Sequence, residues 1–176
     1  MRTKRIPILV KIILLQLLFL LLHYLYDWFP TNFISLISGT HESVYQHMKI
    51  GFFAYITLVL VEYLIIRKNI ISINQFIFSR LFTASFYPLV MMVIYLLGPM
   101  VFGQFQSILA EIIFANVALL LTSLSAIIVE THVESSQPLL GFKIVVIGLF
   151  FLSLAQFIVF TIELPWFDIF AIPPGW

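Results

Sequence analysis

Cysteine is absent from this sequence of 176 residues, which excludes disulfides, thiolate metal sites and cysteine nucleophiles. Charged residues make up only 10% of the chain, whereas soluble domains carry about 25%. A chain with so few charges lacks the polar surface that coats a globule in water. The formal net charge of +1 leaves no basic face for phosphates, so we expect no nucleic-acid partner.

Hydrophobic residues make up 62% of the chain, and apolar runs of about 20 residues recur along it. A run of that length crosses the hydrocarbon core of a bilayer as a helix. A closed β-barrel would need alternating apolar and polar residues, and these runs do not alternate. The sequence therefore predicts an all-α, multi-pass protein of the cell membrane with lipid as its immediate partner.

Five apolar runs predict a helix bundle in one integral membrane domain, residues 1–176. The spans are expected at about 6–29, 41–66, 81–102, 108–130 and 141–162, followed by an interfacial C-terminal tail at 163–176. The first run has no small-residue cleavage site after it, which favours a retained span over a cleaved signal. The segment 69–79 is expected along the interface, and Pro88 and Pro99 are expected to kink or break the third span.

The placement of lysine and arginine predicts the orientation of the chain, because cytoplasmic loops carry an excess of both. One side of a five-span arrangement holds most of these residues, namely Arg2, Lys4, Arg5, Arg67, Lys68, Arg80 and Lys143. The prediction is an N-terminus inside and a C-terminus outside. Lys11 lies within the first span, close enough to its start to extend back to the inner surface.

Residues 38–55, SGTHESVYQHMKIGFFAY, concentrate polar groups at the outer end of the second span. Read as a helix beginning near Thr40, the stretch is capped by Ser38 or Thr40 and has Glu42 in its first turn. Glu42 and His47 then point about 140° apart. This HE-x4-H spacing excludes the HE-x2-H arrangement of zinc proteases, in which both histidines share one helix face.

Histidines and carboxylates nevertheless gather in the outer third of the predicted bundle, where a site could form between helices. The candidate ligands of a divalent metal such as Zn are His23, Asp27, His41, His47 and Glu111. A haem bound by His23 and His47 is a second cofactor hypothesis. The structural alternative is a hydrogen bond between His23 and Asp27, with Glu42 capping backbone amides.

Other residues of this stretch are candidates for catalysis or ligand binding. Glu42 is the candidate acid or base, and His47 is its candidate catalytic partner. The candidate ligand-binding residues are Ser43, Tyr45, Gln46 and Lys49.

A second set of ionisable residues lies toward the predicted inner face. Intramembrane ionisable residues are costly and therefore are functional candidates by default. Glu62, Glu130 and His132 are the candidates for an inner-face relay. The alternative is an ion pair of Glu62 with Arg67 or Arg80.

The stretch HESVYQHMK at 41–49, followed by a Phe-rich helix, resembles the signature of a family of small prokaryotic integral membrane proteins with a domain of unknown function. That signature runs Asn-Glu-Ser, a hydrophobic residue, Trp-Glu-His, a hydrophobic residue and Lys. The matching positions are Glu42, Ser43, His47 and Lys49, whereas positions 41, 45 and 46 differ. The resemblance implies that the outer end of the second span is the working site.

Three classes of function remain open from the sequence. The first is a metal-binding or small-ligand-binding site that supports a membrane-embedded hydrolase acting on a lipid-like substrate. The second is a small transporter or permease component, and the third is a non-catalytic subunit. A homo-oligomer or a larger membrane complex is compatible with each of them.

Overall fold

The computed structural model describes residues 6–103, 105, 107–166 and 168–172. Its helices are α1 (Ile8–Trp28), α2 (Asn32–Ile37), α3 (Val44–Ile66), α4 (Ile73–Phe102), α5 (Ile108–Ser135) and α6 (Leu140–Ile162), with short 3₁₀ helices η1 (Arg67–Asn69) and η2 (Asp168–Phe170). These residues contain no β-strand. The all-α fold class is confirmed.

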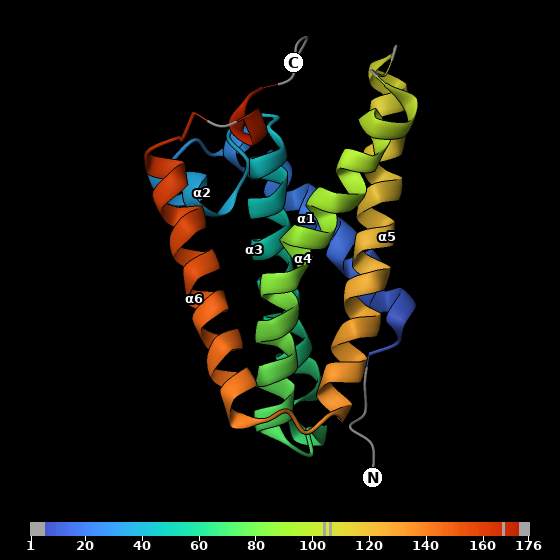
Figure 1. The fold of residues 1–176 in the computed structure, drawn as a ribbon, viewed down its shortest axis with the longest axis vertical. Helices are drawn as coiled ribbons and strands as arrows, with labels where there is room; N and C mark the ends of the chain where they lie inside the picture. Colours follow the sequence, from blue (N-terminus) through green and yellow to red (C-terminus); the bar gives the residue numbers. More distant parts are fainter. Residues whose placement is uncertain (1–5, 104, 106, 167, 173–176) are drawn as a thin grey trace.

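Within the described ranges, five helices are long and apolar enough to cross a membrane: α1, α3 extended by η1, α4, α5 and α6. They alternate in direction, so that the first described residues lie at one end of the bundle and the last described residues at the other (Figure 1). We call the end near Ile6 the lower end and the end near Ile172 the upper end, as in Figure 1. The fold is that of an integral membrane helix bundle, as the apolar runs predict.

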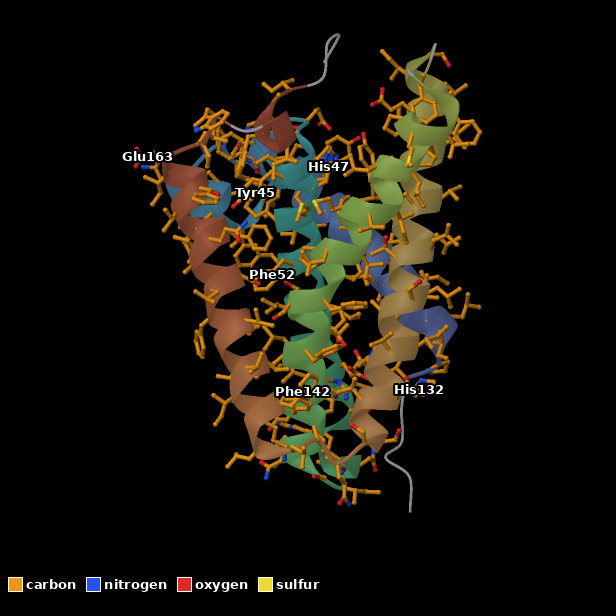
Figure 2. All side chains as sticks on the ribbon, in the orientation of Figure 1. Tyr45, His47, Phe52, His132, Phe142 and Glu163 are labelled. Atoms are coloured by element: carbon orange, nitrogen blue, oxygen red, sulfur yellow. The ribbon has the colours of Figure 1, made fainter. Side chains whose placement is uncertain are left out.

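The core forms around α3, which has the largest buried share of the five long helices. Its fully buried side chains include Tyr45, Phe52 and Tyr55, which belong to one core cluster with residues of α1, α4 and α6. Figure 2 shows Tyr45 and Phe52 on the side of α3 that faces α6. By contrast, only Val146 and Phe157 are buried along α6. The apolar outer side chains of α6 suit contact with lipid, which solvates them as well as a protein core would.

Helix α4 begins at Ile73, earlier than the predicted third span, with the Ser72 hydroxyl accepting a hydrogen bond from the Gln75 amide. It continues through Pro88 and Pro99, so neither proline breaks it. Its upper part leans toward α5 in Figure 1, as a proline kink would produce.

Helix α3 begins at Val44, three residues later than the expected 41–66 span. The expected caps Ser38 and Thr40 are wrong, because the Ser43 hydroxyl accepts a hydrogen bond from the Gln46 amide and caps the helix. Ser43 and Gln46 have the spacing of a capping box, Ser-x-x-Gln, which marks a helix start. Residues 41–43 are therefore outside the helix, and the predicted angle of about 140° between Glu42 and His47 does not apply.

Candidate functional site

Three side chains from separate segments meet at the upper end of the bundle. His23 comes from α1, His47 from the first turn of α3, and Glu42 from the segment before α3. The two imidazole Nε2 atoms lie 3.3 Å apart. Glu42 Oε2 lies 3.4 Å from His23 Nε2 and 3.3 Å from His47 Nε2. We call these three residues the triad.

The His47 ring is held by a backbone contact and by two aromatic rings. Its Nδ1 donates a hydrogen bond to the Ser43 carbonyl at 2.8 Å, which directs Nε2 toward the triad. The rings of Phe19 and Tyr95 stack on it at centroid distances of 6.3 Å. His47 is therefore oriented before any ligand arrives.

His23 and Glu42 are positioned by the connection between α1 and α3. The Ser38 hydroxyl donates to the Leu22 carbonyl and accepts from the Tyr26 amide at 3.1 Å, so the loop after α2 is tied to the last turns of α1. This contact brings the segment that carries Glu42 back over His23. The His23 ring itself packs against Tyr24 at a centroid distance of 4.9 Å.

The His47 ring uses its Nδ1 hydrogen on the Ser43 carbonyl. In the neutral imidazole Nε2 is then an acceptor, and a hydrogen bond from Nε2 to Glu42 requires a second proton on that ring. Hydrogen bonds from the His23 and His47 imidazoles hold the pKa of the Glu42 carboxyl well below its usual range, so Glu42 is an anion. A single cation at the centre would satisfy all three atoms at once.

The spacing of the triad fits a tetrahedral metal ion. Zinc binds histidine nitrogen and carboxylate oxygen at about 2.0–2.1 Å, which places neighbouring ligand atoms about 3.3–3.4 Å apart. The three observed separations are 3.3, 3.3 and 3.4 Å. Among the residues that the structure describes, the triad is the one group of this kind that could hold a metal. A haem does not fit, because the two Nε2 atoms are too close for a macrocycle to lie between them.

The triad lies on the wall of a cavity of about 250 Å³ between α1, α3, α4 and α5. Other polar side chains on this wall are Tyr24, Tyr95, Glu111 and Asn116. The Tyr95 hydroxyl donates a long hydrogen bond to Glu111 Oε1 at 3.5 Å. The cavity thus holds a carboxylate that is not part of the triad.

The remaining candidate ligands are outside the triad. Asp27 is exposed near the end of α1, and no hydrogen bond to His23 occurs in the described part of the chain. His41 Nε2 instead contacts the Gln46 amide nitrogen at 3.3 Å, and burial lowers the pKa of the His41 imidazole. Glu111 reaches the cavity but not the triad.

The candidate ligand-binding residues of α3 face the interior on the side toward α2 and α6. The Tyr45 hydroxyl donates to the Gln156 carbonyl at 2.9 Å. Lys49 Nζ donates to the Ser35 carbonyl at 2.7 Å and to the Thr161 hydroxyl at 3.1 Å. These contacts join helices, and none of these side chains lines the cavity of the triad.

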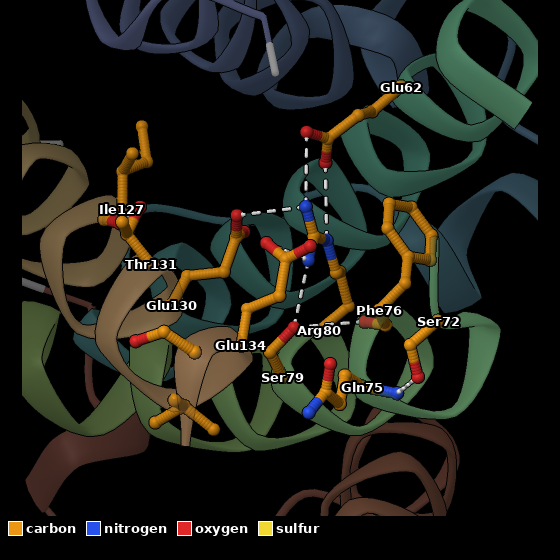
Figure 3. A network of polar contacts seen from close by, with 12 residues as sticks. Glu62, Ser72, Gln75, Phe76, Ser79, Arg80, Ile127, Glu130, Thr131 and Glu134 are labelled. Atoms are coloured by element: carbon orange, nitrogen blue, oxygen red, sulfur yellow. Dashed lines mark hydrogen bonds and ion pairs between the residues drawn. The ribbon is translucent and has the colours of Figure 1, made fainter. Parts of the chain in front are cut away.

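The lower end of the bundle contains a buried ring of ion pairs, and Figure 3 shows the part of it around Arg80. Lys11 Nζ lies 2.9 Å from Glu62 Oε2 and 2.6 Å from Glu130 Oε1. Arg80 contacts the same two carboxylates at 3.2 and 3.3 Å, and it also contacts Glu134 at 2.8 Å. All five side chains are almost inaccessible. The expected extension of Lys11 to the surface is wrong, because its ammonium points inward.

The ring contains two of the three candidate relay residues and omits the third. His132 is exposed, and its Nδ1 donates to the Ile128 carbonyl of its own helix at 2.9 Å. Tyr55, which the sequence reading did not single out, donates its hydroxyl hydrogen to Glu130. Lys11, Glu62, Arg80 and Glu130 come from α1, α3, α4 and α5, so the ring joins four helices.

The chain was compared with family models, curated proteins and solved structures. No family model, no curated protein and no solved structure matches the chain.

Proposed function

We propose that the triad binds a divalent transition metal of the zinc class and that this centre hydrolyses a lipid-like substrate. The proposal is carried by one observation, the three mutual separations of 3.3–3.4 Å between ligand atoms. Two histidines and one glutamate form a ligand set found in catalytic zinc sites, where a fourth position stays open for water or substrate. Here that position would face the cavity.

A metal bound at the triad would polarise a carbonyl or phosphoryl oxygen and lower the pKa of its bound water toward neutral. The protein's own groups supply the rest of the chemistry. Glu42 acts as a ligand in this proposal, which differs from its predicted role as acid or base. Glu111 lines the cavity outside the triad and accepts a long hydrogen bond from Tyr95, and in this proposal it would be the carboxylate that takes up a proton.

The orientation of the centre belongs to the same proposal. The distribution of lysine and arginine supports an N-terminus inside and a C-terminus outside, so the upper end is the outer face of the cell membrane. The resemblance to the Asn-Glu-Ser…Glu-His family is also kept as a proposal. Glu42 and His47 of that signature would bind metal, while Ser43 caps α3 and Lys49 joins α3 to α2 and α6.

The test is the metal stoichiometry of the full chain, purified in mild detergent, stripped with chelator and reloaded with Zn²⁺. We expect about one ion per chain in the wild type. His23→Ala and His47→Ala should each lose it, because two remaining ligands do not hold zinc against a chelator.

Two histidine variants outside the triad serve as matched controls. His41 lies beside the triad and His132 lies at the opposite end of the bundle. The variants His41→Ala and His132→Ala should therefore both retain the zinc ion. Helix content measured by circular dichroism reports whether each variant is folded. A wild type without bound zinc, or equal loss in His41→Ala, would contradict the proposal.

A further inference from the structure

The cavity beside the triad is polar at its upper end and mostly apolar below, where Asn116 on α5 is a polar lining residue. Along α1, Phe19 lies one turn below His23, and along α4, Met91 lies one turn below Tyr95. Along α5, which runs downward, Leu119 lies below Glu111 and completes the apolar part. A ligand that fills this cavity must itself be polar at one end and apolar at the other.

The cavity also reaches the side of the bundle between α1 and α5. Two of its lining residues, Leu20 on α1 and Ile112 on α5, are 41% and 45% exposed. Both lie within helices that are apolar and long enough to cross a membrane. Their exposed surfaces therefore face acyl chains at the edge of the cavity.

The size of the cavity indicates that it holds part of a ligand. Its volume of about 250 Å³ is slightly below the roughly 300–1,000 Å³ of sites that enclose a whole small molecule. A substrate with a long chain would place its reacting group and the adjoining part of the chain inside. The remainder of the chain would stay among the lipids outside Leu20 and Ile112.

From these observations we propose that the substrate is a phospholipid that enters laterally between α1 and α5. Its ester or phosphate group lies at the triad, and the first part of an acyl chain occupies the apolar pocket formed by Phe19, Met91 and Leu119. This inference rests on the proposed function for the chemistry, but lipid occupancy of the cavity can be measured separately from metal binding.

The experiment uses the full chain in phosphatidylcholine vesicles that contain a phosphatidylglycerol with a photoreactive diazirine in one acyl chain. After illumination, the labelled residues are mapped by mass spectrometry, with and without excess unlabelled phosphatidylglycerol. We expect competable labelling on the cavity-lining parts of α1 and α5, and labelling of α6 that unlabelled lipid does not compete.

Two variants of α5 decide where the lipid chain lies. Ala115 lines the cavity, and Ala115→Phe fills it. Val117 is exposed and lies outside the set of lining residues, so Val117→Phe adds the same ring to the outer surface as a matched control. We expect Ala115→Phe to lose the competable labelling and Val117→Phe to keep it, with one zinc ion retained by both.

Each outcome bears on one of the two proposals. Competable labelling that survives in Ala115→Phe, or labelling spread evenly over all the membrane-facing helices, would overturn the lipid inference even if zinc binds. Labelling that is lost in Ala115→Phe in a protein without zinc would support the lipid site and contradict the metal centre.

Discussion

The buried ring at the lower end predicts a large loss of stability when Lys11 is replaced by methionine. Lys11 compensates two carboxylates, Glu62 and Glu130, at 2.9 and 2.6 Å, and all three side chains are at most 4% exposed. Methionine fills a similar volume but removes the charge, which leaves Arg80 alone to compensate Glu62, Glu130 and Glu134. Removing one partner of a buried ion pair costs about 3–5 kcal/mol. Total stabilities are about 5–15 kcal/mol, so Lys11→Met should lose a large share.

The assay is reversible unfolding of the purified chain in mixed micelles with increasing denaturing detergent. Lys68 is exposed in η1, so Lys68→Met is the matched control and should change the free energy of unfolding by less than about 0.5 kcal/mol. The double variant Lys11→Met with Glu62→Gln removes one charge of each sign. It should lose about 0.5–3 kcal/mol less than the sum of its single variants. Equal small effects of Lys11→Met and Lys68→Met would refute the description of the ring.

Three further predictions concern the helix start, the metal and the packing. Ser43→Ala should cost about 0.5–2 kcal/mol of stability by removing the cap of α3, whereas Ser43→Thr should keep most of it; thermal unfolding distinguishes the two. Zinc affinity measured by chelator competition should fall as the pH is lowered, because histidine must be deprotonated at the nitrogen that binds the metal. The pKa of the Glu42 carboxyl is held below its usual range, so this ligand stays ionised and does not contribute to the pH dependence. A zinc affinity that does not change with pH would therefore contradict ligation by the histidines. Gly51→Ala should destabilise by about 1–3 kcal/mol, since a Cβ there would lie 2.8 Å from the Tyr87 ring, while Gly148→Ala meets no atom within 4 Å and should not.

The five long helices could be predicted from the sequence because lipid imposes a simple rule on apolar run length. The meeting of His23 and His47 at one end also follows from five alternating helices. Their contact could not be predicted, since it depends on the depth at which α1 and α3 pack together. No pattern within either helix specifies that depth.

The contacts of Glu42 with both histidines do not follow from a helix that begins at residue 41. A helix from residue 41 would turn Glu42 away from His47, whereas the actual start at Val44 lets the preceding segment fold back. The Ser-x-x-Gln spacing of Ser43 and Gln46 marks the correct start and would have corrected this.

The buried ring was only partly foreseeable. Glu62 and Arg80 were candidates for a pair, but Lys11 was expected to reach the surface. A lysine near a helix end can extend either way, and the direction depends on whether carboxylates from other helices reach the same depth. Glu62 and Glu130 lie at the depth of the Lys11 ammonium and pair with it. This depth depends on how the helices pack, which the sequence does not specify.

The most direct test of the metal centre is X-ray absorption at the zinc edge of the reloaded full chain. Ligation by the triad predicts nitrogen and oxygen ligands at about 2.0–2.1 Å, with the outer-shell scattering of two imidazoles. His47→Ala, loaded with as much zinc as it will hold, should show at most one imidazole. A wild-type spectrum with one imidazole or none would contradict ligation by His23 and His47 together, and with it the proposed centre.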